Sequence, residues 1–444
     1  MSAAGKVSVR DRPDACPGAL RTHRAVDGLL VRLRLPGGRI TSMSARGLAG
    51  VAERHGDGAV HLTSRGNVQL RGVREVDGGA DPALVADVRA CGLLPSLSHE
   101  LVRNVVASPL SGLIGGRVDV GPLVAAVDHV LCADTALATL PGRFLVALDD
   151  GTGDVAGLDA DLTWWAQDDG SGALLVGGVD TGWRVPPDRV PSVVVEVAHE
   201  FLRARGDGGA WHVGELPEGA AGFAELLGRG RGGAPDGLRP PGVAAGLRPP
   251  GPAAGLPVLG AVRQDDGRFT VAALVSLGRL ESQGLRLLAD LADLGAGRLV
   301  VTPWREIVLP GVAPEHVAEV AWRVAAAGLV TEPASPWRRV TACVGRPSCG
   351  RALADVRTLA AQTVEALSPD GPVRVHLAGC ERRCGRPSLA HREVVATSAG
   401  CEVADVGPVS SGRERSGRPL ALLPADVPAA LSTSDTCTRT SEDK

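Results

Sequence analysis

The sequence has almost no net charge and no long apolar run, and it lacks the even number of cysteines that a set of disulfides would use. Its 444 residues carry a formal net charge of -3, with acidic and basic residues mixed along the chain. This balance argues against nucleic acid or an anionic membrane as the main partner. No stretch approaches the roughly eighteen uncharged apolar residues of a membrane helix, and Met1–Gly18 is polar, unlike a leader. We therefore expect a cytoplasmic protein that binds neither nucleic acid nor a membrane.

The nine cysteines are an odd number in a chain without a leader, which excludes a disulfide framework. Free thiols or metal ligands remain. Most of them have no ligand-like spacing, so we expect ordinary core or surface thiols. These are Cys16, Cys91, Cys132, Cys401 and Cys437.

Four cysteines form two spaced pairs, Cys343-x5-Cys349 and Cys380-x3-Cys384. Thiolates are the ligands of an iron–sulfur cluster, and a cubane needs four of them. Zinc sites normally use tighter pairs, which the first spacing fits poorly, and one pair alone is often just buried packing. We expect Cys349 to stand just before a helix over 351–367, and Cys380 and Cys384 to share one helical face if a helix begins there. The quartet predicts a 4Fe–4S cluster.

The chain repeats itself once. Residues 56–73 read GDGAVHLTSRGNVQLRGV and residues 295–312 read GAGRLVVTPWREIVLPGV, with glycines, a threonine and strand residues in common order. Two copies are too few for a solenoid, so a pseudo-twofold pair is expected. The length suits two to four domains.

Each copy has the same predicted order of strands and helices, which indicates an α+β fold with mixed sheets. Leu29–Leu35 alternates as a half-buried strand, with Arg32 and Arg34 opposite its apolar face. Ser44 is expected to cap a helix that ends near His55. Further helices are expected over 82–91, 282–294 and 314–327. Strands are expected over 59–63, 67–73, 269–276, 298–302, 306–309 and 373–377.

These motifs resemble the nitrite and sulfite reductase superfamily and, within it, the precorrin-3B synthases. The resemblance covers nearly the whole chain, from about residue 16 to about residue 405. The stretches that carry it are RPDACPGALR (12–21), LTSRGNVQLRGV (62–73), LVRNVVASPLSG (101–112), LPGRF (140–144), TPWRE (302–306) and VHLAGCERRCGRPS (375–388).

The resemblance implies duplicated ferredoxin-like half-domains plus two α/β domains, the second of which carries the cluster. Separately, aligning the two halves of the chain's own repeat sets Ser108 of the first α/β domain at the place of Cys343. The expected divisions are a first half-domain at 12–95, a first α/β domain at 96–227, a Pro/Gly linker at 228–256, a second half-domain at 257–330, an iron–sulfur domain at 331–409 and a tail at 410–444.

The chain departs from the sulfite and nitrite reductases at two places. Trp304-Arg305-Glu306 stands where those enzymes usually have Asn-Gln-Asn, and this triplet resembles the precorrin-3B synthases. A pair of lysines that binds the small anion is replaced by Arg143 and Leu145. The resemblance therefore favours a tetrapyrrole substrate over a small anion.

On this resemblance, the activity is the conversion of precorrin-3A to precorrin-3B with O2, by C20 hydroxylation and γ-lactone formation. Arginine forks suit the many carboxylates of a precorrin. The resemblance and this chemistry indicate a set of substrate-binding residues, whereas no catalytic residue is assigned. The set is Arg65, Asn67, Arg103, Asn104, Arg143 and Arg305.

The resemblance also implies a mononuclear non-haem iron, but no 2-His-1-carboxylate spacing is assignable. Neither a Walker loop nor a G-x-G-x-x-G after a strand is convincing, so electrons would come from a ferredoxin or an NADH-dependent reductase. Two alternatives stay open: a sirohaem-dependent sulfite or nitrite reductase, and a non-catalytic iron–sulfur or tetrapyrrole-binding protein.

Overall fold

The computed structural model describes residues 14, 16–229, 246–250, 256, 259–369, 371–408 and 415–432. Most of the predicted linker at 228–256 and the end of the chain after residue 432 lie outside these ranges. The chain divides into two compact units: unit 1 holds residues 1–24 and 28–329, and unit 2 holds residues 25–27 and 330–444. None of the described helices combines the length and the apolar character that crossing a bilayer requires.

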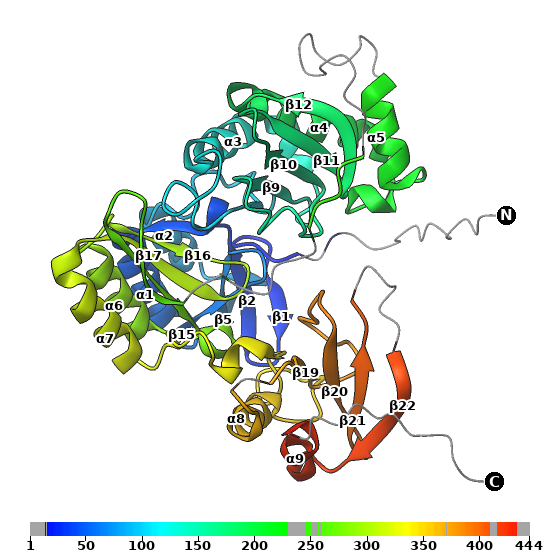
Figure 1. The fold of residues 1–444 in the computed structure, drawn as a ribbon. Coiled ribbons are helices and arrows are strands. Elements are labelled where there is room, and N and C mark those ends of the chain that lie inside the picture. Colours follow the sequence, from blue (N-terminus) through cyan, green and yellow to red (C-terminus); the bar gives the residue numbers. More distant parts are fainter. Residues whose placement is uncertain are drawn as a thin grey trace. The chain divides into compact units, whose positions relative to one another are not determined.

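The two copies of the repeat build two five-stranded sheets in unit 1 (Figure 1). Sheet 1 contains, in spatial order, β1 (His23–Ala25), β2 (Gly28–Leu33), β5 (Val68–Val73), β4 (Ala59–Leu62) and β15 (Arg279–Glu281). Sheet 2 contains β13 (Gly260–Arg263), β14 (Phe269–Leu274), β17 (Glu306–Val312), β16 (Arg298–Val301) and β3 (Arg39–Thr41). Each sheet therefore ends in a strand contributed by the other copy.

Two equivalent hydrogen bonds secure this exchange of strands. The amide of Ser42 donates to the carbonyl of Gly297 at 2.9 Å, and the amide of Ser282 donates to that of Gly58, also at 2.9 Å. A glycine is required where the exchanged strand begins, because a Cβ on Gly38 (φ 69°) would lie 1.9 Å from the Val301 carbonyl oxygen. The predicted pseudo-twofold pair is therefore interlocked rather than side by side.

Helices cover one face of these two sheets and close a common core. They are α1 (Ser42–His55), α2 (Pro82–Ala90), α6 (Ser282–Ala292) and α7 (Val317–Ala326). The core between them is aliphatic, with Val31, Leu48 and Leu288 at most 1% exposed. The prediction that Ser44 caps α1 is wrong: Thr41 is the cap, because its backbone is extended and its side chain accepts the Ser44 amide.

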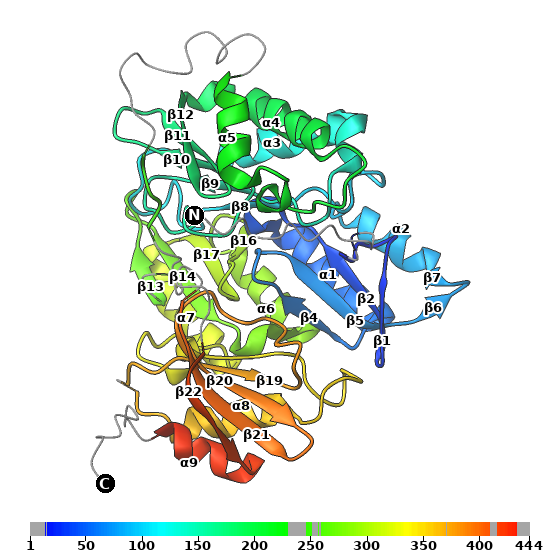
Figure 2. The ribbon, with the colours of Figure 1, turned by 90° about the vertical axis from the view of Figure 1, so that its right-hand side faces the viewer.

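Sheet 3, the third five-stranded sheet of unit 1, has helices α3 (Gly121–Ala133), α4 (Val190–Arg205) and α5 (Gly219–Arg229) packed beside it (Figure 2). Its strands, in spatial order, are β8 (Val105–Ala107), β9 (Val146–Asp149), β10 (Leu162–Ala166), β11 (Gly172–Val176) and β12 (Val179–Val185). β8, β9 and β10 are mutually parallel, and β11 is antiparallel to both of its neighbours, β10 and β12.

Sheet 4, in unit 2, repeats this topology. Its strands are β18 (Val340–Ala342), β19 (Val375–Ala378), β20 (His391–Thr397), β21 (Gly400–Val406) and β22 (Arg415–Leu422). β18, β19 and β20 are again mutually parallel, and β21 is antiparallel to both of its neighbours, β20 and β22. Helix α8 (Val356–Ala366) connects the first two strands, and α9 (Val427–Ser432) lies against α8.

The stretch from residue 410 onward, predicted as a tail, contains both β22 and α9. Pairing with β21 accounts for the strand, because a ladder partner can order a polar segment that has little apolar pattern of its own. Val427 and Leu431 are at most 1% exposed and anchor the helix. Residues 415–432 therefore belong to the folded unit.

Candidate functional site

The four predicted ligand cysteines lie on the loops that follow β18 and β19. Cys343 comes directly after β18, and its amide donates to the carbonyl of Leu377 on β19 at 3.0 Å. Cys380 follows β19 after a single glycine, Gly379. Because neighbouring parallel strands end at the same edge of a sheet, the two loops meet there. The topology thus brings together two cysteine pairs that are far apart in the sequence.

The four thiols lie near enough to influence one another's pKa. Burial raises the pKa of Cys343, and the charges of Cys349 and Cys380 raise it further, whereas amide hydrogen bonds from Gly379 and Gly345 lower it. Burial likewise raises the pKa of Cys384; nearby Arg382 lowers it and the other three thiols raise it. Four mutually repelling thiolates need a compensating cation, and iron would supply one.

The donor set fits an iron–sulfur cluster better than a single ion. A zinc ion about 2.3 Å from each sulfur would bring the sulfurs to about 4 Å from one another. Among the described residues, no three of these sulfurs gather within 4.8 Å of one another. The amide of Gly379 donates to the Sγ of Cys343 at 3.1 Å, the kind of hydrogen bond that tunes a cluster. Four thiols with this spacing suit a 4Fe–4S cluster.

Two local predictions at the quartet are wrong. Helix α8 begins at Val356, because the Asp355 side chain caps it by accepting the amides of Arg357 and Thr358. Cys349 therefore lies in a loop, away from a helix N-terminus. No helix begins at Cys380 either; the segment to Cys384 is a pair of turns.

Sheet 3 carries the same loop geometry without the thiol. The amide of Ser108 donates to the Leu148 carbonyl at 3.1 Å, and the amide of Asp150 donates to the Ser108 Oγ at 3.1 Å. These bonds reproduce those of Cys343 with Leu377 and Gly379. The strand registers agree with the match. The predicted equivalence of Ser108 and Cys343 is therefore confirmed.

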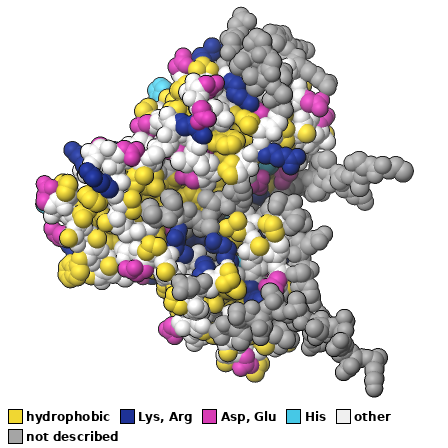
Figure 3. Space-filling view, viewed as in Figure 1, with side chains coloured by type: hydrophobic (Ala, Val, Ile, Leu, Met, Phe, Trp, Pro, Cys, Tyr) yellow, Lys and Arg dark blue, Asp and Glu magenta, His cyan; other side chains and the backbone are white. Residues whose placement is uncertain are grey.

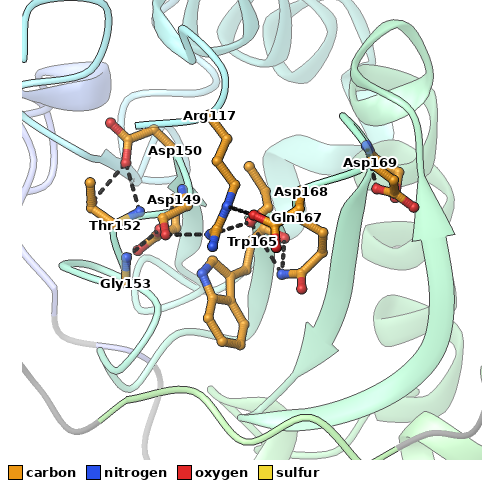
Figure 4. Close-up of polar contacts among 12 residues, drawn as sticks. Arg117, Asp149, Asp150, Thr152, Gly153, Trp165, Gln167, Asp168 and Asp169 are labelled. Atoms are coloured by element: carbon orange, nitrogen blue, oxygen red, sulfur yellow. Dashed lines mark hydrogen bonds and ion pairs between the residues drawn. The ribbon is translucent and has the colours of Figure 1, made fainter. Parts of the chain in front are cut away.

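Carboxylates occupy the loop of sheet 3 that corresponds to the Cys380 loop (Figure 4). Asp149, Asp150 and Asp154 place oxygens within 4.8 Å of one another. The fully buried Asp149 accepts four backbone amides, those of Gly151, Gly153, Val155 and Ala156. Burial and the charge of Asp149 raise the pKa of Asp154 to about 7. Asp149 thus organises this loop through its backbone.

A group of arginines lies on and beside sheet 1. The Nη1 of Arg65 donates to the Arg143 carbonyl at 3.0 Å, and the Nη2 of Arg32 donates to the Gln69 Oε1 at 3.2 Å. Burial lowers the pKa of Arg32 and of Arg65, and it lowers that of Arg34 to about 9. The visible face of the molecule also shows a group of basic side chains near its middle (Figure 3).

Two of these guanidinium groups are only partly hydrogen-bonded. Within the described part of the chain, the Nε of Arg32 and both Nη atoms of Arg34 are buried without a hydrogen bond. Arg34 is 2% exposed and only its Nε donates, to the Leu101 carbonyl at 3.3 Å. Buried cations without counter-charges are costly unless a ligand pairs with them. The set of six predicted residues omitted both, although the alternation of the strand placed them opposite its apolar face.

The structure gives the other predicted substrate-binding residues varied surroundings. Arg103 makes a bidentate ion pair with Asp128, with both N···O distances 2.7 Å. Asn67 and Asn104 are 2% exposed and bind backbone: Asn67 accepts the Leu35 amide, and Asn104 donates to two carbonyls. Arg103, Asn67 and Asn104 therefore hold loops of unit 1 in place.

Arg305 and Leu145 mark the positions where the sequence departs from the reductases. Arg305 has a φ of 64°, its carbonyl accepts the Val275 amide, and burial lowers its pKa. Leu145 is 4% exposed and packs in a small core with Val106 and Val155. A hydrocarbon side chain in that core contacts no small anion.

The comparisons with known proteins agree with the duplication. Residues 21–77 and 262–327 each match the family model of the nitrite/sulfite reductase ferredoxin-like half domain. A ferredoxin–nitrite reductase of Synechococcus elongatus is 28% identical, with 81% of this chain and 75% of that protein covered. A precorrin-3B synthase of Sinorhizobium sp is 25% identical, with 88% and 82% covered.

A solved structure extends the likeness to the fold. The Mycobacterium tuberculosis NirA protein superposes with a TM-score of 0.70 over 91% of this chain and 79% of that one, at 21% identity. The predicted α+β fold, with duplicated ferredoxin-like half-domains and two α/β domains, is confirmed.

Proposed function

We propose that this chain, which carries the duplicated half domain and the fold of the nitrite/sulfite reductase superfamily, is an iron–sulfur oxidoreductase that converts precorrin-3A to precorrin-3B. The observation that carries the proposal is a set of buried guanidinium nitrogens, the Nε of Arg32 and both Nη atoms of Arg34, which have no hydrogen bond among the described residues. Such groups suit an organic ligand with many carboxylates.

The cluster would be held by Cys343, Cys349, Cys380 and Cys384. When bound, it would supply one-electron transfer between an external donor and the substrate site. Relatives named ferredoxin–nitrite reductases support an external donor, and a ferredoxin or an NADH-dependent reductase is proposed here. Amide hydrogen bonds such as that from Gly379 would steady the sulfurs.

The residues of unit 1 would bind and orient the macrocycle. Arg32, Arg34 and Arg65 would pair with its carboxylates, and Arg143 and Arg305 are proposed to add contacts. Asn67 and Asn104 would act through the backbone they hold, and Arg103 through its ion pair with Asp128. In the proposed reaction one oxygen atom of O2 enters C20 as a hydroxyl and the other leaves as water. Two electrons from the donor and two protons complete the balance, and a ring A acetate then closes the γ-lactone.

A sirohaem-dependent nitrite or sulfite reductase is the second candidate, because several relatives of similar identity carry the name nitrite reductase. The same arginines would suit sirohaem carboxylates. Against this candidate stands Leu145, which is buried in a hydrocarbon core where reductases are expected to have an anion-binding lysine.

One experiment separates the candidates. The protein is purified anaerobically, and iron, acid-labile sulfide and extractable tetrapyrrole are measured. Iron and sulfide without sirohaem, together with O2-dependent turnover of precorrin-3A, are expected. Bound sirohaem with reduction of nitrite or sulfite would overturn the proposal in favour of the reductase. A cluster without either activity would indicate a non-catalytic binding protein.

A further inference from the structure

The loop that carries Cys380 and Cys384 has no regular secondary structure to fix it. It runs as two turns between β19 and β20. Cys384 is the one exposed member of the quartet. The turn bonds are few: the Arg383 amide donates to the Cys380 carbonyl at 3.1 Å, and the Arg386 amide donates to the Arg383 carbonyl at 3.3 Å. A loop this open needs a further anchor to present a ligand reproducibly.

Two arginines that flank Cys384 supply the anchor by meeting one carboxylate. The Nε of Arg383 donates to the Glu393 Oε2 at 3.0 Å. Arg386 meets both oxygens of Glu393, with its Nη2 3.3 Å from Oε2 and its Nε 2.8 Å from Oε1. The Glu393 side chain lies on β20 and is 0% exposed. A rigid strand thus holds the loop from both sides of the cysteine.

The backbone of Arg383 shows that this contact is costly to make. Its φ is 48°, in the left-handed region that glycine normally occupies. A long side chain in this conformation stores strain that the surroundings must offset. The ion pair with Glu393 explains why arginine occupies this position, because glycine would fit the turn but has no side chain to reach β20.

Sheet 3, which has no counterpart of the cysteine quartet, carries no carboxylate at the position of Glu393. In sheet 4 Arg392 pairs with Val375, and in sheet 3 Leu162 pairs with Val146. These registers set Thr163 at the position of Glu393. Thr163 is 1% exposed and carries no charge. The buried carboxylate therefore accompanies the cysteines rather than the fold they share with sheet 3.

We propose that Glu393, through Arg383 and Arg386, is a positioning residue that holds the Cys380–Cys384 loop in the conformation that ligates the cluster. The proposal rests on the cluster of the proposed function. Outer-shell partners of metal ligands commonly change metal retention by about 10–100-fold. Removal of one partner from a buried ion pair leaves the others unpaired, so the loop loses its anchor.

The test compares Glu393→Gln with Val395→Ala, a variant on the same strand whose buried residue carries no charge. In the purified full-length chain, cluster loss to an iron chelator is followed by absorbance. The Gln variant is expected to lose iron at least about ten times faster than wild type, while the Ala variant stays near the wild-type rate. Equal rates of iron loss from the Gln variant and the Ala variant would overturn the proposal. Arg386→Lys gives a milder perturbation if the Gln variant does not fold.

Hydrogen exchange in the iron-free protein separates this inference from the proposed function. Glu393→Gln is expected to speed exchange of the Arg383 and Arg386 amides selectively, with the amides of β20 unchanged. Uniform acceleration would mean that Glu393 serves the whole unit, and would overturn the proposal. If wild-type protein binds no iron or sulfide, yet the selective effect is seen, the loop anchor stands and the proposed cluster enzyme falls.

Discussion

The amide of Gly379 donates a hydrogen bond of 3.1 Å to the Sγ of Cys343, and the amide of Asp150 makes the equivalent bond to the Ser108 Oγ. One loop geometry therefore occurs twice, once with a thiol and once with a hydroxyl. A hydroxyl is a poor ligand for iron–sulfur chemistry, whereas a thiolate is the normal one. The proposed cluster therefore belongs to sheet 4, where the thiol stands.

Cys343→Ser should therefore abolish cluster binding. Wild-type protein is expected to hold about four iron atoms per chain, and the variant well under half of that, as measured by iron and acid-labile sulfide assays. Cys401→Ala is the matched control, since Cys401 lies in the same unit but is buried on β21. Full iron content in the Cys343 variant would contradict the assignment of the quartet.

Arg34→Met should weaken tetrapyrrole binding without weakening the fold. The variant removes a buried charge whose Nη atoms lack partners, so the free energy of unfolding of the ligand-free protein should hold or rise by about 1–2 kcal/mol. Tetrapyrrole affinity should fall by at least about tenfold, or ~1.4 kcal/mol. Denaturant unfolding and an absorbance titration measure the two effects. A lower free energy of unfolding with unchanged tetrapyrrole affinity would contradict the prediction and would show that Arg34 stabilises the fold. Arg286→Met, at an arginine whose side chain is 41% exposed, is the control.

Leu145→Lys tests whether the lysine of the reductases would be tolerated here. The side chain packs in a hydrocarbon core, so the new charge should lower the free energy of unfolding by several kcal/mol, about 3 or more. Leu145→Met, similar in volume, should cost less than about 1.5 kcal/mol. Thermal or denaturant unfolding compares the pair. A stable Lys variant that gained sulfite or nitrite reduction would favour the reductase reading.

Asp154 should make stability fall as pH rises. Burial and the charge of Asp149 raise its pKa to about 7 from an ordinary 3.8. Between these values the folded protein keeps a proton that the unfolded chain has lost, so the free energy of unfolding decreases as pH increases.

Asp154→Asn should remove that decrease. The free energy of unfolding of the variant, taken relative to that of wild type, should increase by about 1–3 kcal/mol as the pH is raised from about 5 to about 8. Unfolding curves at the two pH values provide the measurement. The same difference between the proteins at both pH values would show that Asp154 titrates normally in the folded state.

The repeat and the cysteine quartet could be predicted because their signals are local. Glycines, strand alternation and capping residues each specify a short segment. The helix at Pro82–Ala90, for example, begins at the predicted residue and has Asp81 as its N-cap. The spacing of Cys380 and Cys384 likewise lies within one loop. Likeness of the two copies also foretold the Ser108 and Cys343 equivalence, since equal patterns fold into equal strands.

Long-range pairing is what the sequence left open. The bond from Ser42 to Gly297 joins segments far apart in the chain, and its register follows from the packing of α1 on α6. The same holds for β22, whose order comes from β21. Local patterns could not predict either arrangement, because a strand partner is chosen by sheet order and not by the strand itself.

Sequence by itself determined the chemistry on offer: four thiols in two spaced pairs, arginines opposite an apolar strand face, and a leucine in place of a lysine. Only the tertiary structure decided which of these groups are satisfied. Among the described residues, the Arg103 guanidinium pairs with the Asp128 carboxylate, whereas that of Arg34 donates only to the Leu101 carbonyl, although both are buried arginines. The physical reason is that burial and counter-charge are set by residues from other elements. The sequence pattern therefore identifies an ionisable group, and the fold decides whether that group has a partner within the protein.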